Sequence, residues 1–239
     1  TSAQVAPTLA VVQGAALAMA SEASNGAVTV SAEAGSTVSV TFTNGQASVI
    51  KSLNATGSPQ AVGLSLGEVA SLGNGVITVS AIATDVAGNP SVAAGTFFTL
   101  DTAAPNAPIL VATANTTAAE ALAGAVTATA ELNANIFVTF SDGTHNVTKT
   151  LIGTGVPQTV ALLAGDLGGA LGLVDGSITV SASTEDAAGN PSVVSTTSFI
   201  LDTLAPVAPA LTVVANADLA TANEATTGAV TITAESGST

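Results

Sequence analysis

The side chains of this chain that could bind a ligand are its acids, which return at fixed positions. Asp85-Val86-Ala87-Gly88-Asn89-Pro90-Ser91 is followed by Leu100-Asp101-Thr102, and both segments occur again 101 residues later, from Asp186 and from Leu201. Twelve of the sixteen acids occupy recurring positions of this kind. Carboxylates gathered in one place repel one another unless a cation lies among them. The pattern therefore indicates a site for a cation.

Calcium is the cation that this set of side chains favours. It accepts about six to eight oxygen ligands from carboxylates, carbonyls and water in a flexible geometry. Zinc would need His or Cys, and the chain has one His and no Cys. We therefore predict structural Ca²⁺ at the junctions between repeats. The predicted ligands are Asp85, Asp186, Asp101, Asp202, Glu22, Glu120, Glu33, Glu131 and Glu235.

The same acids also suit structural roles. Asp followed by Gly and Asn is favourable turn chemistry, because Gly and Asn tolerate positive φ and Asp accepts backbone N–H groups. We interpret Asn89 and Asn190 in this way. Glu68 and Asp166 are expected to begin a short helical turn, where the helix dipole favours an acid. A turn motif does not explain the linker aspartate Asp101, for which we favour metal binding.

The period of the acids divides the chain into residues 1–101, 102–202 and the opening of a third unit, 203–239. A unit of this length can bury its own core, whereas the last part has sequence for only two strands. Proline-punctuated segments such as 104–108 mark the boundaries, because proline fixes φ and cannot join a central ladder. The sequence therefore predicts a tandem array.

Period-2 alternation predicts the elements that position the acids. Val38, Val40 and Phe42 alternate with polar residues and end at Asn44-Gly45, a tight hairpin signal that the second unit repeats as Asp142-Gly143. About seven short strands in each complete unit, with no long helix, indicate an all-β fold. We predict tandem immunoglobulin-like, seven-stranded antiparallel β-sandwiches arranged as beads on a string.

The strand order of such a sandwich places the acids at its two ends. Glu22 and Asp101 are expected at the trailing end of the first unit. Glu131 and Asp186 are expected at the leading end of the second, so a short linker would bring the four together. The same reasoning places Glu120, Asp202 and Glu235 at the second junction and Glu33 with Asp85 at the leading end of the first unit.

Composition excludes several classes of function. A formal net charge of −14 with only two basic residues disfavours binding to nucleic acid. No run approaches the roughly 18 apolar residues of a membrane span. His145 is the only histidine and is expected to be an exposed loop residue. Since there is also no phosphate-binding loop and no catalytic constellation, we predict that the chain is not an enzyme.

The combined motifs Glu-x-x-x-Gly-x-Val-Thr-x-x-x-Glu, Asp-x-Ala-Gly-Asn-Pro-Ser and Leu-Asp-Thr-x-Ala-Pro resemble the bacterial Ig-like repeats of giant secreted adhesins, including biofilm-associated and type I-secreted proteins. The resemblance implies an extracellular stalk on the bacterial surface, stiffened by calcium at the aspartates, that supports adhesion and biofilm formation. Its partners would be neighbouring repeats of the same chain. The alternatives are a strand-exchanged surface filament containing other copies, and an accessory or ligand-binding segment of a large secreted enzyme.

Overall fold

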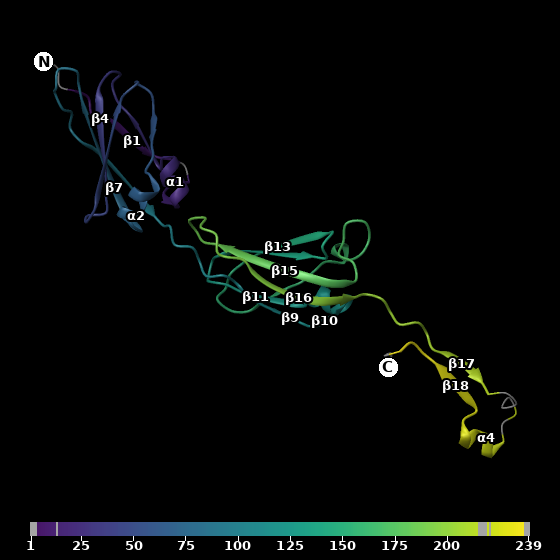
Figure 1. Ribbon diagram of the computed structural model, residues 1–239. Helices are drawn as coiled ribbons and strands as arrows, with labels where there is room; N and C mark the ends of the chain where they lie inside the picture. Colours follow the sequence, from purple (N-terminus) through teal and green to yellow (C-terminus); the bar gives the residue numbers. More distant parts are fainter. Residues whose placement is uncertain (1–3, 13, 215–218, 220, 237–239) are drawn as a thin grey trace.

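The computed structural model describes residues 4–12, 14–214, 219 and 221–236, and its regular structure is mainly β-strand (Figure 1). The first repeat forms a three-stranded sheet, β1-β3-β6, facing a five-stranded sheet, β2-β8-β7-β4-β5. Its elements are β1 (Thr8–Val11), β2 (Leu17–Ala18), α1 (Ala20–Asn25), β3 (Val28–Ser31), β4 (Thr37–Thr43), β5 (Ser48–Asn54), β6 (Gln60–Val62), α2 (Leu66–Leu72), β7 (Gly75–Thr84) and β8 (Ala94–Leu100).

The second repeat has the same two sheets in the same order, β9-β11-β14 and β10-β16-β15-β12-β13. The two repeats are therefore sandwiches whose strands are mostly antiparallel, which confirms the predicted fold class. The elements are β9 (Ile109–Ala112), β10 (Asn115–Thr117), α3 (Ala118–Ala123), β11 (Val126–Thr129), β12 (Asn135–Ser141), β13 (Asn146–Ile152), β14 (Gln158–Val160), the 3₁₀ turn η1 (Ala164–Asp166), β15 (Gly176–Glu185) and β16 (Ser195–Asp202).

The structure differs from the prediction of seven strands because the first strand is split between the sheets. β1 pairs with β3, and the chain then crosses over so that β2 runs parallel to β8 at the edge of the other sheet. β9 and β10 divide in the same way. The segment expected to be a polar loop after this strand is a short helix, α1 or α3, closed by a left-handed glycine.

The alternating residues form two separate cores. Val38, Val40 and Phe42 are buried as predicted, and the Phe42 ring meets Phe98 edge-on at a centroid distance of 6.5 Å. The second core repeats this arrangement with Phe140 against Phe199. Buried residues of one cluster run from Ala15 to Leu100 and those of the other from Ala121 to Leu201. Each sandwich thus has a core of its own.

Residues after 202 form a small antiparallel pair, as the prediction of two strands requires. β17 (Ala210–Val213) pairs with β18 (Val230–Thr233), and α4 (Ala222–Thr227) precedes β18. Every position in the two strands is exposed. Figure 1 shows the three parts following one another along the chain, with α1 and α2 at the end of the first sandwich that faces the second.

Candidate functional site between the repeats

The trailing end of the first repeat holds the first residues of the linker. The Asp101 carboxylate accepts hydrogen bonds from the backbone N–H of Ala103 (3.0 Å) and from the Asn74 side chain (3.3 Å). The Asn74 carbonyl oxygen accepts from both the N–H and the hydroxyl of Thr102 (3.0 and 2.8 Å). The linker aspartate therefore fixes the chain as it leaves the sandwich.

The second exit repeats this arrangement with another acid. Asp202 accepts from the N–H of Leu204 at 3.1 Å. Asp175 stands where the first repeat has Asn74, and it accepts from the N–H and the hydroxyl of Thr203 (2.9 and 2.8 Å). The chain thus leaves both sandwiches in the same geometry. The acceptor for the threonine N–H and hydroxyl is the Asn74 amide oxygen in the first repeat and the Asp175 carboxylate in the second.

The leading end of the second repeat holds the last residues of the linker. Glu131 accepts from the N–H and the side-chain amide of Asn106 (3.2 and 2.6 Å). The hydroxyl of Thr184, which is fully buried, donates to the Asn106 carbonyl at 3.0 Å. In the third part, Glu235 likewise accepts from the N–H of Val207 at 3.1 Å. The linker is therefore anchored to the repeats on both sides.

The acidic turn of the second repeat is closed by its own amides. Asp186 accepts from the N–H of Ala188 (2.8 Å) and from the N–H and side-chain amide of Asn190 (2.9 and 3.0 Å). Burial of the Asp186 carboxyl would raise its pKa, but the hydrogen bonds from Asn190 and the turn outweigh this effect and lower the pKa. The carboxylate therefore stays ionised inside the turn.

The turn of the first repeat has the same internal bonds. Asp85 accepts from the N–H and the side-chain amide of Asn89, both at 2.8 Å. The hydrogen bond from the Asn89 side chain is the largest cause that lowers the pKa of Asp85. The turn chemistry inferred for the two asparagines is therefore present in both repeats.

The turn of the second repeat also contacts the first repeat. The Asn190 side-chain amide donates to the backbone carbonyl of Asp101 at 3.0 Å. A Cβ placed on Gly189 would lie 3.6 Å from the Met19 methyl carbon, so the glycine lies against that side chain. Sequence reasoning missed both contacts, since it assigned Asn190 to the turn alone. The signal that could have found Met19 is that it stands where the other repeats have threonine, Thr117 and Thr221.

Glu22, Glu120 and Glu224 lie in the first turns of the short helices α1, α3 and α4. Glu120 accepts from the N–H and hydroxyl of Thr117 (2.8 and 2.9 Å), which lowers its pKa, and Glu224 does the same with Thr221. Glu22 accepts from the N–H of Met19 at 3.1 Å. Glu120 and Glu224 therefore complete capping boxes with their threonines, whereas Glu22 makes only the glutamate half of the pattern, because Met19 gives no side-chain cap.

Glu68 and Asp166 also follow the helical interpretation. Glu68 completes a capping box with Ser65, and it pairs with Lys51 of β5. Asp166 pairs with Lys149 in the same way. The hydrogen bond from Lys51, followed by that from the Ser65 N–H, lowers the pKa of Glu68 to about 2. The two lysines of the chain thus tie the β5 and β13 strands to the adjacent helical turns.

The predicted calcium ligands do not form a coordination sphere as they lie. Among the residues that the structure describes, no three or more His, Cys, Asp or Glu side chains are grouped so that they could hold a metal ion. Glu131 and Asp186 line one depression at the leading end of the second repeat, but three N–H donors already bind the Asp186 carboxylate. Glu33 lies at the leading end of the first repeat with Asp85, since Thr37 pairs with Thr84.

His145 is not the exposed loop residue that the sequence predicts. Its side chain is 22% exposed, and its Nδ1 lies 2.8 Å from the Asp142 carboxylate. Asp142 also accepts from the N–H groups of Thr144, His145 and Val174. The Asp142 carboxylate therefore holds the hairpin together, and the His145 ring contacts this carboxylate instead of lying free in solvent.

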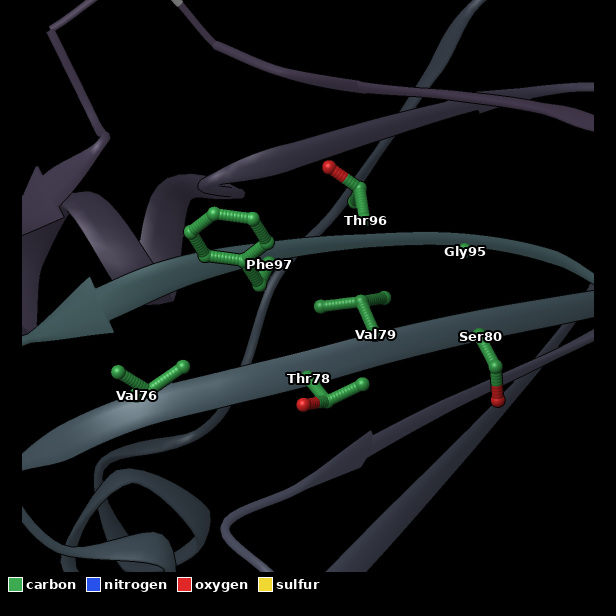
Figure 2. A pocket seen from close by; sticks show the side chains of 7 residues that line it. All are labelled: Val76, Thr78, Val79, Ser80, Gly95, Thr96 and Phe97. Carbon is green, nitrogen blue, oxygen red and sulfur yellow. The ribbon is translucent and has the colours of Figure 1, made fainter.

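The first repeat also has a hollow on the outer face of β7 and β8 (Figure 2). Phe97, which is 66% exposed, borders it together with Val76. Gly95, which has no side chain, lines the hollow on the same strand as Phe97. The residues lining this hollow include no ionisable side chain. The hollow therefore offers neither acid–base nor metal chemistry. The second repeat has Ser198 where the first has Phe97.

No protein-family model matches the chain, and no curated protein matches it in sequence. Among solved structures, it is similar to a 1.5-MDa bacterial ice-binding adhesin involved in host cell surface retention (19% identity, TM-score 0.42, 91% of this chain and 71% of the other). It is also similar to a Ca²⁺-stabilised, ice-binding adhesin of an Antarctic bacterium (23%, 0.46, 91% and 54%). A third match is to the fibronectin(III)-like modules of Clostridium thermocellum CbhA (13%, 0.39, 74% and 84%).

Adhesin repeats of the kind that the motifs resemble are therefore among the structural neighbours of this chain. The chain spans about half of the second of these adhesin structures. Because these TM-scores are below 0.5, the matches establish nothing about ligands or activity. No helix in the described part of the chain is long and apolar enough to cross a membrane.

Proposed function

We propose that this chain is a spacer segment of a large extracellular bacterial adhesin, in which sandwiches of the predicted boundaries 1–101 and 102–202 and the start of a third repeat, 203–239, follow one another as part of a stalk. The observation that carries the proposal is the joint between the first two repeats. The linker is hydrogen-bonded to both of its neighbours, and the second repeat also touches the first directly through Asn190.

These contacts suit a spacer because they limit rotation between the sandwiches. A linker without contacts would behave as a flexible coil, whereas proline-rich segments are semi-rigid. Pro105 and Pro108 flank Asn106, whose N–H and carbonyl are both bonded to the second repeat. The linker can therefore pass a force from one sandwich to the next and hold the two at a fixed distance.

The recurring acids fit this role without enzymatic chemistry. Most of them accept N–H groups at helix starts, turns or linkers, which are positions that set the shape of the repeat and of the joint. Calcium at the joint, predicted from the sequence, stays a prediction of the proposal.

Small-angle X-ray scattering of the full chain tests the proposal, in buffer with excess Ca²⁺ and in buffer with a chelator. We expect an extended particle with a single well-defined maximum dimension. A particle that is compact, or that scatters as freely jointed sandwiches in both buffers, would contradict the spacer role. A length that shortens only in chelator would show that calcium stiffens the joint, and isothermal titration with CaCl₂ reports binding directly.

A strand-exchanged filament is the second candidate, and the exposed β17–β18 pair favours it. Among the residues that the structure describes, no further sheet faces this pair, and every position of both strands is exposed. Such a pair can be covered by strands that follow it in the same chain or by a strand from another chain. Light scattering over a range of concentrations distinguishes the two functions, because a filament gives a ladder of masses and a spacer gives one mass.

A further inference from the structure

The two acidic turns have nearly the same sequence but different surroundings. In the second repeat, Ala188 and Asn190 are each only 7% exposed. Their counterparts in the first repeat are an exposed Ala87 and a half-buried Asn89. Since the internal bonds of the two turns agree, the difference arises from the first repeat, whose trailing end covers the turn of the second.

The contact uses two groups that both turns possess. One is the side-chain amide of the asparagine, which carries two N–H donors. Asn190 directs its amide to Asp186 of its own turn and to the Asp101 carbonyl of the preceding repeat. Asn89 makes the same bond to Asp85, and its second N–H occupies the position from which Asn190 reaches the carbonyl.

The other group is the bare backbone of the turn glycine. Gly88 and Gly189 have nearly the same left-handed φ, 87° and 89°. A Cβ on Gly88 would meet nothing within 4 Å, whereas one on Gly189 would touch the Met19 methyl carbon at 3.6 Å. The glycine thus gives a side chain on the preceding repeat a place to lie, and at Gly88 none of the described residues fills that place.

We propose that the turn 85–89 is a docking surface for the trailing end of another repeat of this chain's own type. The occupant is a repeat that presents the carbonyl equivalent to Asp101 to Asn89 and the methionine equivalent to Met19 to Gly88. This inference rests on the proposed spacer function and names the residues by which one repeat recognises the next.

The first test compares Asn190→Ala with Asn89→Ala in the full chain. The two substitutions remove the same bond within the turn, but only Asn190→Ala removes the bond to the preceding repeat. Because the chain has no cysteine, Ser58→Cys and Thr144→Cys place one spin label on each sandwich. We expect a single narrow distance in the parent and in Asn89→Ala, and its loss in Asn190→Ala.

The second test places a copy of residues 1–101 ahead of Thr1, with one label on the added repeat and one at Ser58. Asn89→Ala, silent in the parent chain, should now abolish the narrow distance across the new joint. Met19→Thr in the added copy should broaden that distance without touching the turn. Circular dichroism checks that each variant is folded.

A new joint that is as narrow with Asn89→Ala as without it would overturn the docking proposal, as would a joint that is broad with both turns intact. This failure is distinguishable from that of the spacer role. A parent chain that stays extended in scattering while its joints ignore both asparagines would still be a spacer, joined by its linker alone.

Discussion

Phe98→Ala should lower the melting temperature of the first repeat and leave that of the second unchanged. Phe98 is 1% exposed and packs edge-on against Phe42 in a core confined to the first repeat. Truncating a buried phenylalanine costs about 3–5 kcal/mol, and a whole domain is stable by roughly 5–15 kcal/mol. For about 100 residues, each kcal/mol lowers the melting temperature by roughly 4–8 °C. The first transition should therefore fall by at least about 12 °C.

Differential scanning calorimetry of the full chain measures this effect. Each repeat of about 100 residues should contribute an unfolding enthalpy of roughly 60–80 kcal/mol. The variant should move about half of the total enthalpy to lower temperature and leave the other half in place. Phe97→Ala is the matched control on the same strand, because Phe97 is 66% exposed. If instead the whole enthalpy moves as one peak, the two sandwiches unfold as one unit and the boundary at 101 is wrong.

Two further changes probe the frame that holds the joint. Lys51→Met removes the largest cause of the low pKa of Glu68, about 2, so NMR titration should show that pKa rising toward its ordinary value of 4.5. Because the folded pKa is depressed in the parent, the stability that Glu68 contributes is complete above about pH 4.5 and is lost as the pH falls toward 2. An unchanged titration would refute the ion pair. Gly63→Ala would place a Cβ 2.2 Å from the Ser24 carbonyl oxygen and should therefore lower the melting temperature of the first repeat. Gly67→Ala is the control, since a Cβ there has nothing within 4 Å, and it should leave the melting temperature unchanged. Equal melting temperatures of the two variants would show that the close approach of Gly63 to Ser24 does not matter.

The core could be predicted from sequence because burial follows the alternation of each strand. Val38, Val40 and Phe42 share one face whatever the rest of the chain does, and the structure buries all three. The hairpin at Asn44-Gly45 also forms, although its strands end at Thr43 and resume at Ser48 and Gly45 alone of the two has a positive φ, 90°. Local rules of this kind predict the sandwich well. They failed at the first strand, where the crossing between sheets leaves no change in the alternation.

The roles of the acids were harder to predict, because periodicity locates a carboxylate at one end of the sandwich but does not say which donors surround it. A local signal existed for part of the set. Thr117-x-x-Glu120 and Thr221-x-x-Glu224 are capping boxes. The first repeat obscures the pattern, because Met19 stands at the corresponding position. The Asn190 contact had no local signal, since Asp101 lies 89 residues away.

The Asp186 carboxylate, one of those that suggested a cation, is surrounded by hydrogen-bond donors at the joint. Hydrogen bonds to the ionised form stabilise a carboxylate, and Asp186 receives three of them, which lower its pKa although burial opposes this. These three bonds use three of the roughly four lone-pair sites that a carboxylate offers. A calcium ion can therefore bind the Asp186 carboxylate while the Asn190 amide keeps its bond to the Asp101 carbonyl. The length of the particle in chelator, compared with its length in excess Ca²⁺, decides whether such an ion stiffens the joint.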